Sequence, residues 1–306
     1  MSDGLLLVDK PEGMTSHDVV AQCRRLLGRK DIGHAGTLDP LATGLLVLLI
    51  GQATKLSDYI LNGDKAYVTQ LQLGKTTDTD DITGALLSQN RIPELSYESL
   101  EKAVQSLSGP QQLRVPIYSA VKIKGRKLYD KARSGEVVEA PIRTMTFMDI
   151  KLLSFEGDSV QVQFRCSKGS YVRAWVRALG EILGCGATMT GLRRTRSCPY
   201  DLERAFSLNE LQDSLPESFY ELPAWVPMAQ TLPDWPSVRV EGMDEKLISN
   251  GQIPKKLERF LELEFCGMKD LQGVKLLSRR SGQLVCLLEH KQPLSFKIRR
   301  VFPIKH

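Results

Sequence analysis

The spacing of apolar residues along the chain predicts both buried strands and amphipathic helices. Residues 4–8 and 45–50 are short apolar runs, which are typical of interior strands. Residues 65–73 and 159–166 alternate apolar with polar side chains, as a strand does when it buries one face. These four segments are the expected strands of a central sheet.

Three other segments have helical spacing. Residues 16–27, 96–107 and 171–183 place apolar side chains three and four positions apart. Ser16 is the expected N-cap of the first helix, and Gly28 is expected to end it. We expect this first helix to pack against the sheet.

The length of the chain predicts two domains. At 306 residues it exceeds the usual size of a single domain, which favours one large domain and one small one. The character of the sequence changes near Asp234, after which prolines separate short strand-like runs. We therefore expect a large domain at residues 1–233 and a small β-rich module at residues 234–306.

Composition narrows the class of protein only a little. Apolar residues make up 42% and charged residues 25%, which is ordinary for a globular protein, and the net charge of +5 fits a polyanionic partner without establishing one. The six cysteines form no Cys-x-x-Cys pair and the four histidines give no zinc spacing. We expect buried free thiols and no metal site.

The sequence carries no recognisable targeting segment. The N-terminal apolar run is too short for a signal peptide, and no basic stretch precedes it. No apolar stretch reaches the roughly 18 residues that a membrane-spanning helix needs. We expect a cytoplasmic protein with no membrane partner.

A turn-rich loop at residues 33–44 carries the most informative chemistry. Its sequence, GHAGTLDPLATG, contains three glycines and a single carboxylate, Asp39. Pro40 stiffens the backbone beside that carboxylate, and loops that present a side chain in this way often hold functional residues. An Asp-Pro pair by itself is more often a turn, so the loop alone leaves both interpretations open.

Other candidate residues also have structural alternatives. A Lys-Pro turn such as the one at Lys10 is usually an exposed loop, and a strand tyrosine such as Tyr67 usually fills a core. Residues 77–81, TDTDD, lack an EF-hand pattern and are expected to be a solvated loop. A basic run with interleaved aromatics fits either an RNA contact or an ordinary charged surface. Its cations are Lys122, Lys124, Arg126 and Lys127.

Arginines mark two further segments. An arginine in the first turn of a helix opposes the helix dipole, so Arg173 is expected to face an anion. Arg193, Arg194 and Arg196 follow at a density that is typical of phosphate binding, although a solvated surface gives the same pattern.

Taken together, these motifs resemble those of the TruB family of tRNA pseudouridine synthases. The loop at 33–44 is joined by KPxGxTS from Lys10, by SKGxYxR ending at Arg173 and by LRR from Leu192. The resemblance covers about residues 4–197. It implies an α+β fold with a mixed, mostly antiparallel sheet flanked by helices, and a C-terminal module that is PUA-like and binds RNA.

The resemblance also implies an activity. It implies isomerisation of uridine to pseudouridine at position 55, in the TΨC loop of tRNA. Because this reaction needs no redox step and no external energy, we expect no cofactor, and we expect a monomer with no obligate protein partner. Asp39, Tyr67 and Arg173 would form the catalytic centre, and an insertion at about 111–145 would clasp the tRNA stem-loop. The residues implied to bind the substrate are Lys10, His34, Lys122, Lys124, Arg126, Lys127, Tyr171, Leu192, Arg193 and Arg194.

The implied chemistry assigns a role to several of these side chains. Moving C1′ from N1 to C5 needs no redox step, but it needs an ionised carboxylate as nucleophile at C1′ or as base for the 2′ proton. Asp39 is the candidate, with Arg173 beside it to favour the charged form. Tyr67 would stack on the base above an apolar floor at Leu192. The base must first leave its stack, and His34 is associated with the rearranged loop.

Two other functions fit parts of the sequence. A noncatalytic RNA-binding protein would keep the basic segments but would not need Asp39. A glycosidase-like hydrolase usually needs two carboxylates flanking the bond, and the motif loop supplies one.

Overall fold

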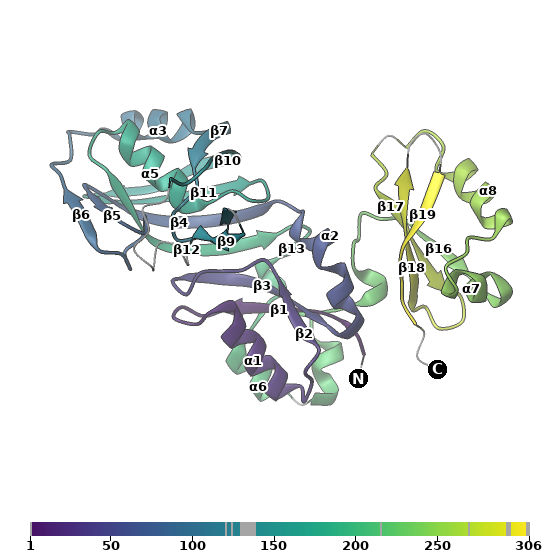
Figure 1. Ribbon diagram of the computed structural model, residues 1–306. Helices are drawn as coiled ribbons and strands as arrows, with labels where there is room; N and C mark the ends of the chain where they lie inside the picture. The colour runs from purple at the N-terminus through teal and green to yellow at the C-terminus, as the bar shows by residue number, and fades with distance from the viewer. Residues whose placement is uncertain are drawn as a thin grey trace.

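The chain forms one large mixed sheet and a separate four-stranded sheet near the C-terminus (Figure 1). Both belong to a computed structural model. It describes residues 2–119, 121–123, 125–128, 139–214, 216–268, 270–291 and 295–303.

The large sheet runs in the order β14-β1-β3-β12-β4-β11-β10-β7. Within this path only the pairs β1–β14 and β3–β12 are parallel, so the prediction of a mixed, mostly antiparallel sheet is confirmed. The strands on the path are β1 (Gly4–Lys10), β3 (Ala42–Ile50), β4 (Lys65–Leu73), β7 (Gly109–Arg114), β10 (Ile142–Glu156), β11 (Ser159–Cys166), β12 (Ala187–Ser197) and β14 (Phe206–Ser207). Three shorter strands pair off this path, namely β2 (Ile32–Ala35), β13 (Tyr200–Asp201) and β15 (Trp225–Pro227).

Helices and two small hairpins surround this sheet. The α-helices are α1 (Ser16–Leu26), α2 (Ser57–Leu61), α3 (Tyr97–Ser106), α5 (Val172–Ile182) and α6 (Leu208–Asp213). The 3-10 helices are η1 (Gly51–Leu56), η2 (Leu202–Arg204), η3 (Pro216–Glu221) and η4 (Met228–Gln230). The hairpins pair β5 (Lys75–Thr77) with β6 (Leu86–Gln89), and β8 (Lys122–Ile123) with β9 (Arg126–Lys127).

The start of α1 differs from the prediction by one residue. Thr15 is the N-cap, and it forms a reciprocal capping box with Asp18. Ser16 lies inside the helix and is buried, and its hydroxyl bonds to the backbone of Leu38 instead. The prediction of Ser16 as the cap was therefore wrong, because two consecutive hydroxyl residues satisfy the same sequence pattern.

Two hydrophobic cores meet in the middle of the sheet. The buried residues of one core come from residues 5–60 and from segments after residue 199, and those of the other come from residues 71–189. The parallel pair β3–β12 joins them, with Gly44 opposite Arg194. Gly44 has φ +96°, and a Cβ there would lie 2.3 Å from the carbonyl oxygen of Arg194. Only glycine fits this contact, which explains the last glycine of the motif loop.

The C-terminal module is mixed rather than only β-rich. Its sheet runs β16-β17-β18-β19 and has its own hydrophobic core. The sequence predicted strands here but not the two helices, although Leu257 and Leu261 are buried at helical spacing. The elements are β16 (Ser237–Val240), α7 (Gly242–Ser249), α8 (Lys255–Glu264), β17 (Gly273–Ser278), β18 (Leu284–Lys291) and β19 (Ser295–Val301).

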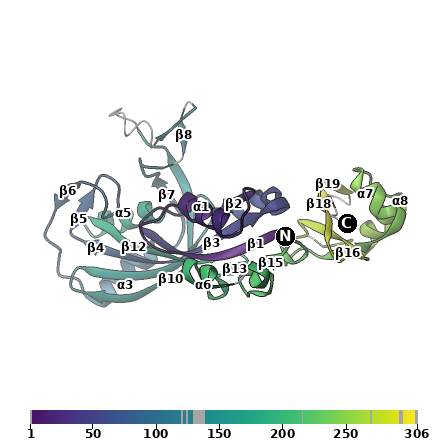
Figure 2. The ribbon, with the colours of Figure 1, turned by 90° about the horizontal axis from the view of Figure 1, so that it is seen from below.

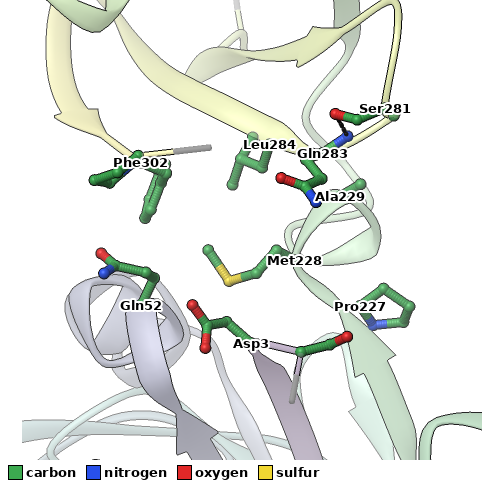
Figure 3. Close-up of a pocket in the computed structure, with 12 residues that line it drawn as sticks. Asp3, Gln52, Pro227, Met228, Ala229, Ser281, Gln283, Leu284 and Phe302 are labelled. Carbon is green, nitrogen blue, oxygen red and sulfur yellow. Dashed lines mark hydrogen bonds between the residues drawn. The ribbon is translucent and has the colours of Figure 1, made fainter. Parts of the chain in front are cut away.

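The module packs against the η1–α2 segment of the large domain. The ring of Trp235 meets the Tyr59 ring edge-on at 5.3 Å, and Lys55 Nζ lies 5.8 Å from the centre of the Phe302 ring. A cavity of about 460 Å³ remains between the two parts, with the Met228 side chain projecting into it (Figure 3). Leu284 and Phe302 belong to a core of the large domain, so the contact is partly apolar.

The cysteine prediction holds for four of the six thiols. Cys23, Cys166, Cys185 and Cys286 are buried, whereas Cys198 is half-buried and Cys266 is exposed. Cys266 lies just beyond α8 at the surface of the module, where the scattered spacing gave no hint of exposure. Within the described ranges, no group of three His, Cys, Asp or Glu side chains is arranged to hold a metal ion. None of the described helices is long and apolar enough to cross a membrane.

Candidate active site

Three candidate residues from separate elements line one cleft of about 570 Å³. Asp39 lies in the loop between β2 and β3, Tyr67 lies in β4, and Arg173 lies in the first turn of α5. Tyr171 and Leu192 also line this cleft. The cleft lies beside the β3–β12 junction, so it takes residues from both halves of the sheet.

Arg173 and Asp39 form the central ion pair. Arg173 Nη2 lies 3.0 Å from Asp39 Oδ2, and the Arg173 side chain is 9% exposed while that of Asp39 is 47% exposed. The guanidinium also donates to the carbonyl oxygens of Thr79 and Tyr118, each at 3.0 Å. Arg173 is therefore fixed from several sides, and one carboxylate stands beside it open to the cleft.

Asp81 is a second partner of Arg173, which the sequence did not predict. Its Oδ2 lies 3.5 Å from Arg173 Nη1, and its side chain is 8% exposed. Its other oxygen accepts hydrogen bonds from the Thr79 hydroxyl at 2.9 Å and from the Thr83 backbone at 3.0 Å. The prediction of a solvated loop at residues 77–81 was therefore wrong. A buried arginine needs compensating negative charge, and this loop provides it.

The loop that carries Asp39 is clamped by the segment before α1. The Ser16 hydroxyl donates to the Leu38 carbonyl at 3.1 Å and accepts from the Leu38 amide at 2.9 Å. Gly13 donates its amide to the carbonyl of Pro40 at 2.9 Å. The KPxGxTS motif thus holds the residues on both sides of Asp39.

Lys10 and Arg194 are buried and bonded to the protein itself. Lys10 Nζ donates to the carbonyls of Pro11, Met14 and Pro40, at 2.8, 2.6 and 3.3 Å. The resemblance implies that both cations contact RNA, but neither side chain is accessible. A buried cation replaces its lost hydration with backbone carbonyls, and here those carbonyls belong to the segments that shape the site.

Arg194 holds the opposite end of the motif loop. Its guanidinium donates to the Leu45 carbonyl at 2.6 Å and to the Gly36 carbonyl at 3.1 Å. It also lies opposite Tyr67 in the β12–β4 register. Burial raises the pKa of Tyr67, and the positive charge of Arg194 partly opposes this shift. The hydroxyl is therefore protonated at neutral pH.

The remaining predicted residues lie outside this central cluster. His34 lies in β2, where its ring meets that of His17 edge-on at 5.3 Å, and burial lowers its pKa. Arg193 is half exposed and pairs with Asp9 at 2.7 Å. Of the basic run, Arg126 is exposed and Lys122 and Lys127 lie in the β8–β9 hairpin, whereas Lys124 lies outside the described residues.

Asp80 gives a testable pH dependence next to the site. It pairs with Arg177, and burial raises its pKa from 3.8 to about 6 although Arg177 opposes the shift. Between about pH 4 and 6 the folded protein keeps a proton that the unfolded chain has released, so the free energy of unfolding falls as pH rises. Asp80→Asn should remove about 1–3 kcal/mol of this change. Urea unfolding of both proteins across this range measures the difference, and parallel curves would contradict the assignment.

A glycosidase arrangement does not fit this geometry. Asp39 is the carboxylate that lines the cleft, while Asp81 is buried and bound to neighbouring hydroxyl and amide groups. Among the described residues lining the cleft there is no second carboxylate to flank a scissile bond.

Comparison with known proteins agrees with the motifs. Residues 24–172 match the model of the TruB family pseudouridylate synthase N-terminal domain, and residues 173–221 match that of the tRNA pseudouridylate synthase B C-terminal domain. A tRNA pseudouridine synthase B from Bdellovibrio bacteriovorus is 43% identical over 300 residues, covering 98% of this chain and 97% of that protein. One from an Azoarcus species is 36% identical over 291 residues, covering 92% and 97%.

Solved structures support the fold. A chain in a structure of an H/ACA RNP bound to a substrate RNA containing 2′-deoxyuridine has a TM-score of 0.71 at 22% identity, covering 98% of this chain and 85% of that one. A chain in a Cbf5-Nop10-Gar1 complex has a TM-score of 0.70 at 24% identity, covering 97% and 84%. With two family models covering most of the large domain and relatives aligned over nearly the full length, the chain belongs to the TruB family of tRNA pseudouridine synthases.

Proposed function

We propose that this enzyme converts the uridine at position 55, in the TΨC loop of tRNA, to pseudouridine, with Asp39 as the essential carboxylate. The observation that carries the proposal is the ion pair between Asp39 and Arg173 at 3.0 Å, in which Asp39 stays open to the cleft. In the proposal, residues 1–233 perform the reaction as a monomer, and residues 234–306 add RNA contacts.

The reaction needs a charge at the sugar and a surface for the base. Asp39 either attacks C1′ or takes the 2′ proton, and both routes require its ionised form. Arg173 neutralises part of that charge without blocking the carboxylate, because its own bonds fix it to Thr79, Asp81 and Tyr118. Tyr67 stacks on the base and assists loss of the C5 proton, and Leu192 forms the apolar floor.

The base must be turned out of the tRNA loop to reach Asp39. This step costs a few kcal/mol of stacking, which contacts to the rest of the tRNA offset. His34 in its neutral form, Tyr171 and Arg193 are assigned to the RNA near the cleft. The four cations of the basic run are assigned to the phosphates of the stem.

A transcript assay tests the proposed function. An unmodified tRNA transcript should lose the uridine at position 55 without a change in mass, and carbodiimide labelling should detect pseudouridine at that position alone. A transcript with cytidine at position 55 is the control. Conversion at other uridines, or no conversion, would contradict the proposal.

The basic run should determine part of the salt dependence of binding. In Figure 2 the β8 strand projects from the body on the side opposite α3. Replacing Lys122, Lys124, Arg126 and Lys127 with Ala should flatten the slope of log affinity against log salt by roughly three units. Each cation that contacts a phosphate displaces counterions from the RNA on binding, and the fourfold variant would no longer displace them. Filter binding at several salt concentrations measures this. Lys102→Ala in α3 is the control, and an equal slope for the fourfold variant would identify the run as an ordinary charged surface.

The clamp on the motif loop should matter for turnover. Ser16→Ala removes both hydrogen bonds to Leu38, next to Asp39, and should lower the single-turnover rate about ten- to a hundredfold, because small misplacements of a reacting group are costly. Thr15→Ala is the matched control, since it removes the helix cap and costs about 1 kcal/mol of unfolding free energy. A parent-like rate for Ser16→Ala, or an equal loss in both variants, would show that the clamp does not position Asp39.

A further inference from the structure

The hydroxyl of Ser119 is a polar group in the cleft that the proposed mechanism does not use. Ser119 is 6% exposed, and its Oγ is shielded from solvent with no hydrogen-bond partner among the described residues. It nevertheless lines the cleft that holds Asp39. Burying a hydroxyl without a hydrogen-bond partner is unfavourable, and a bound acceptor would remove that cost.

The other polar side chains of the cleft are already satisfied or hydrated. Arg173 is bonded to carboxylates and carbonyls, and the Ser170 hydroxyl lies 3.2 Å from that of Ser167. Thr37 is exposed, so water reaches it. Ser119 is the one described residue of the cleft that combines burial with an unpartnered hydroxyl.

The backbone places Ser119 next to the catalytic ion pair. Its amide donates to the Ile117 carbonyl at 3.0 Å, in a tight turn. The carbonyl of the preceding residue, Tyr118, accepts from Arg173 Nη2, the same nitrogen that lies 3.0 Å from Asp39. The peptide unit that joins Tyr118 to Ser119 is therefore hydrogen-bonded to the guanidinium that holds the Asp39 carboxylate.

We infer that the Ser119 hydroxyl donates a hydrogen bond to a carbonyl oxygen of the uracil base in the cleft. This inference rests on the proposed function. When the bond from N1 to C1′ breaks, its electron pair leaves with the base, and the negative charge spreads over N1, O2 and O4. A donor to O2 or O4 therefore binds more strongly in the transition state than in the ground state. Because the Ser119 Oγ is shielded in the structure, this contact requires a rotation about the Cα–Cβ bond to a staggered position that faces the cleft.

Variants of Ser119 test the inference. Ser119→Ala should lower the single-turnover rate about ten- to a hundredfold, with the tRNA dissociation constant changed by less than about twofold. Ser119→Cys has nearly the same size and a weaker donor, so its rate should fall between those of the parent and the Ala variant. If Ser119→Ala does not fold, the difference in rate between the parent and Ser119→Cys tests the inference. Ser170→Ala is the matched control, because that hydroxyl already has a partner.

Thio-substituted tRNA identifies the contact. Sulfur is a poor hydrogen-bond acceptor. If the hydroxyl contacts O2, the parent and Ser119→Ala should have similar rates on tRNA with 2-thiouridine at the target position. If it contacts O4, the two rates should be similar with 4-thiouridine instead. A parent-like rate for folded Ser119→Ala, or a ratio unchanged by both thio substitutions, would overturn the inference. If the parent converts no uridine in an unmodified transcript, the proposed function itself fails, whatever Ser119 does.

Discussion

Replacing Asp39 with Asn should abolish the isomerisation while tRNA binding survives. The substitution keeps the size of the side chain and an oxygen that accepts from Arg173, but it removes the charge that acts at the sugar. Losing a nucleophile or base outright should lower the single-turnover rate by at least about a thousandfold. The affinity should change little, since RNA loops are recognised mainly through their shape and their unstacked bases.

Asp9→Asn is the matched control for this experiment. Asp9 is also a partly exposed carboxylate paired with an arginine, Arg193, but it does not line the cleft. Its loss should leave turnover within a few-fold of the parent. If folded Asp39→Asn isomerised uridine at a rate near that of the parent, the carboxylate assignment would be wrong.

Asp81→Asn should also lower turnover strongly, although Asp81 does not line the cleft. Neutralising it leaves Asp39 as the remaining carboxylate within ion-pair distance of Arg173 among the described residues, so the guanidinium is drawn toward the catalytic carboxylate. We expect the rate to fall about tenfold to a thousandfold, with little change in tRNA affinity. Single-turnover rates and filter binding separate the two effects.

The neighbouring acid supplies the control for Asp81. Asp80 forms its ion pair with Arg177 and acts on Arg173 only through a longer-range attraction, so Asp80→Asn should disturb the same loop with a smaller effect on the charge around Arg173. If the substitutions only loosened the loop, the single-turnover rates of Asp80→Asn and Asp81→Asn would fall equally. Such a result would assign Asp81 a structural role and not a positioning role toward Arg173.

The sequence predicted which residues line the cleft better than which residues hold them in place. Asp39, Tyr67 and Arg173 were identified from motifs, and the structure brings all three to one cleft. Whether they are the catalytic residues stays a prediction. Asp81 was missed because its importance depends on Arg173, a residue distant in the sequence, and Ser119 was missed because burial without a partner leaves no sequence pattern.

Lys10 and Arg194 show the converse error. Both were interpreted as RNA contacts because cations near an RNA site favour that role. In the structure they are buried donors to backbone carbonyls of the loop around Asp39. Sequence patterns reveal charge but not burial, and burial decides whether a cation meets a phosphate or a carbonyl.

The division of the large sheet between two cores sets an order for folding during synthesis. The buried residues of one core all lie between Leu71 and Met189, so all of their side chains have been made once residue 189 is added. The first strand, by contrast, pairs with β14 and β15, and Leu6 lies opposite Trp225. A nascent chain shorter than about residue 227 therefore leaves an apolar edge of β1 without its partner, and the half that carries Asp39 closes only after the half that carries Arg173 is complete.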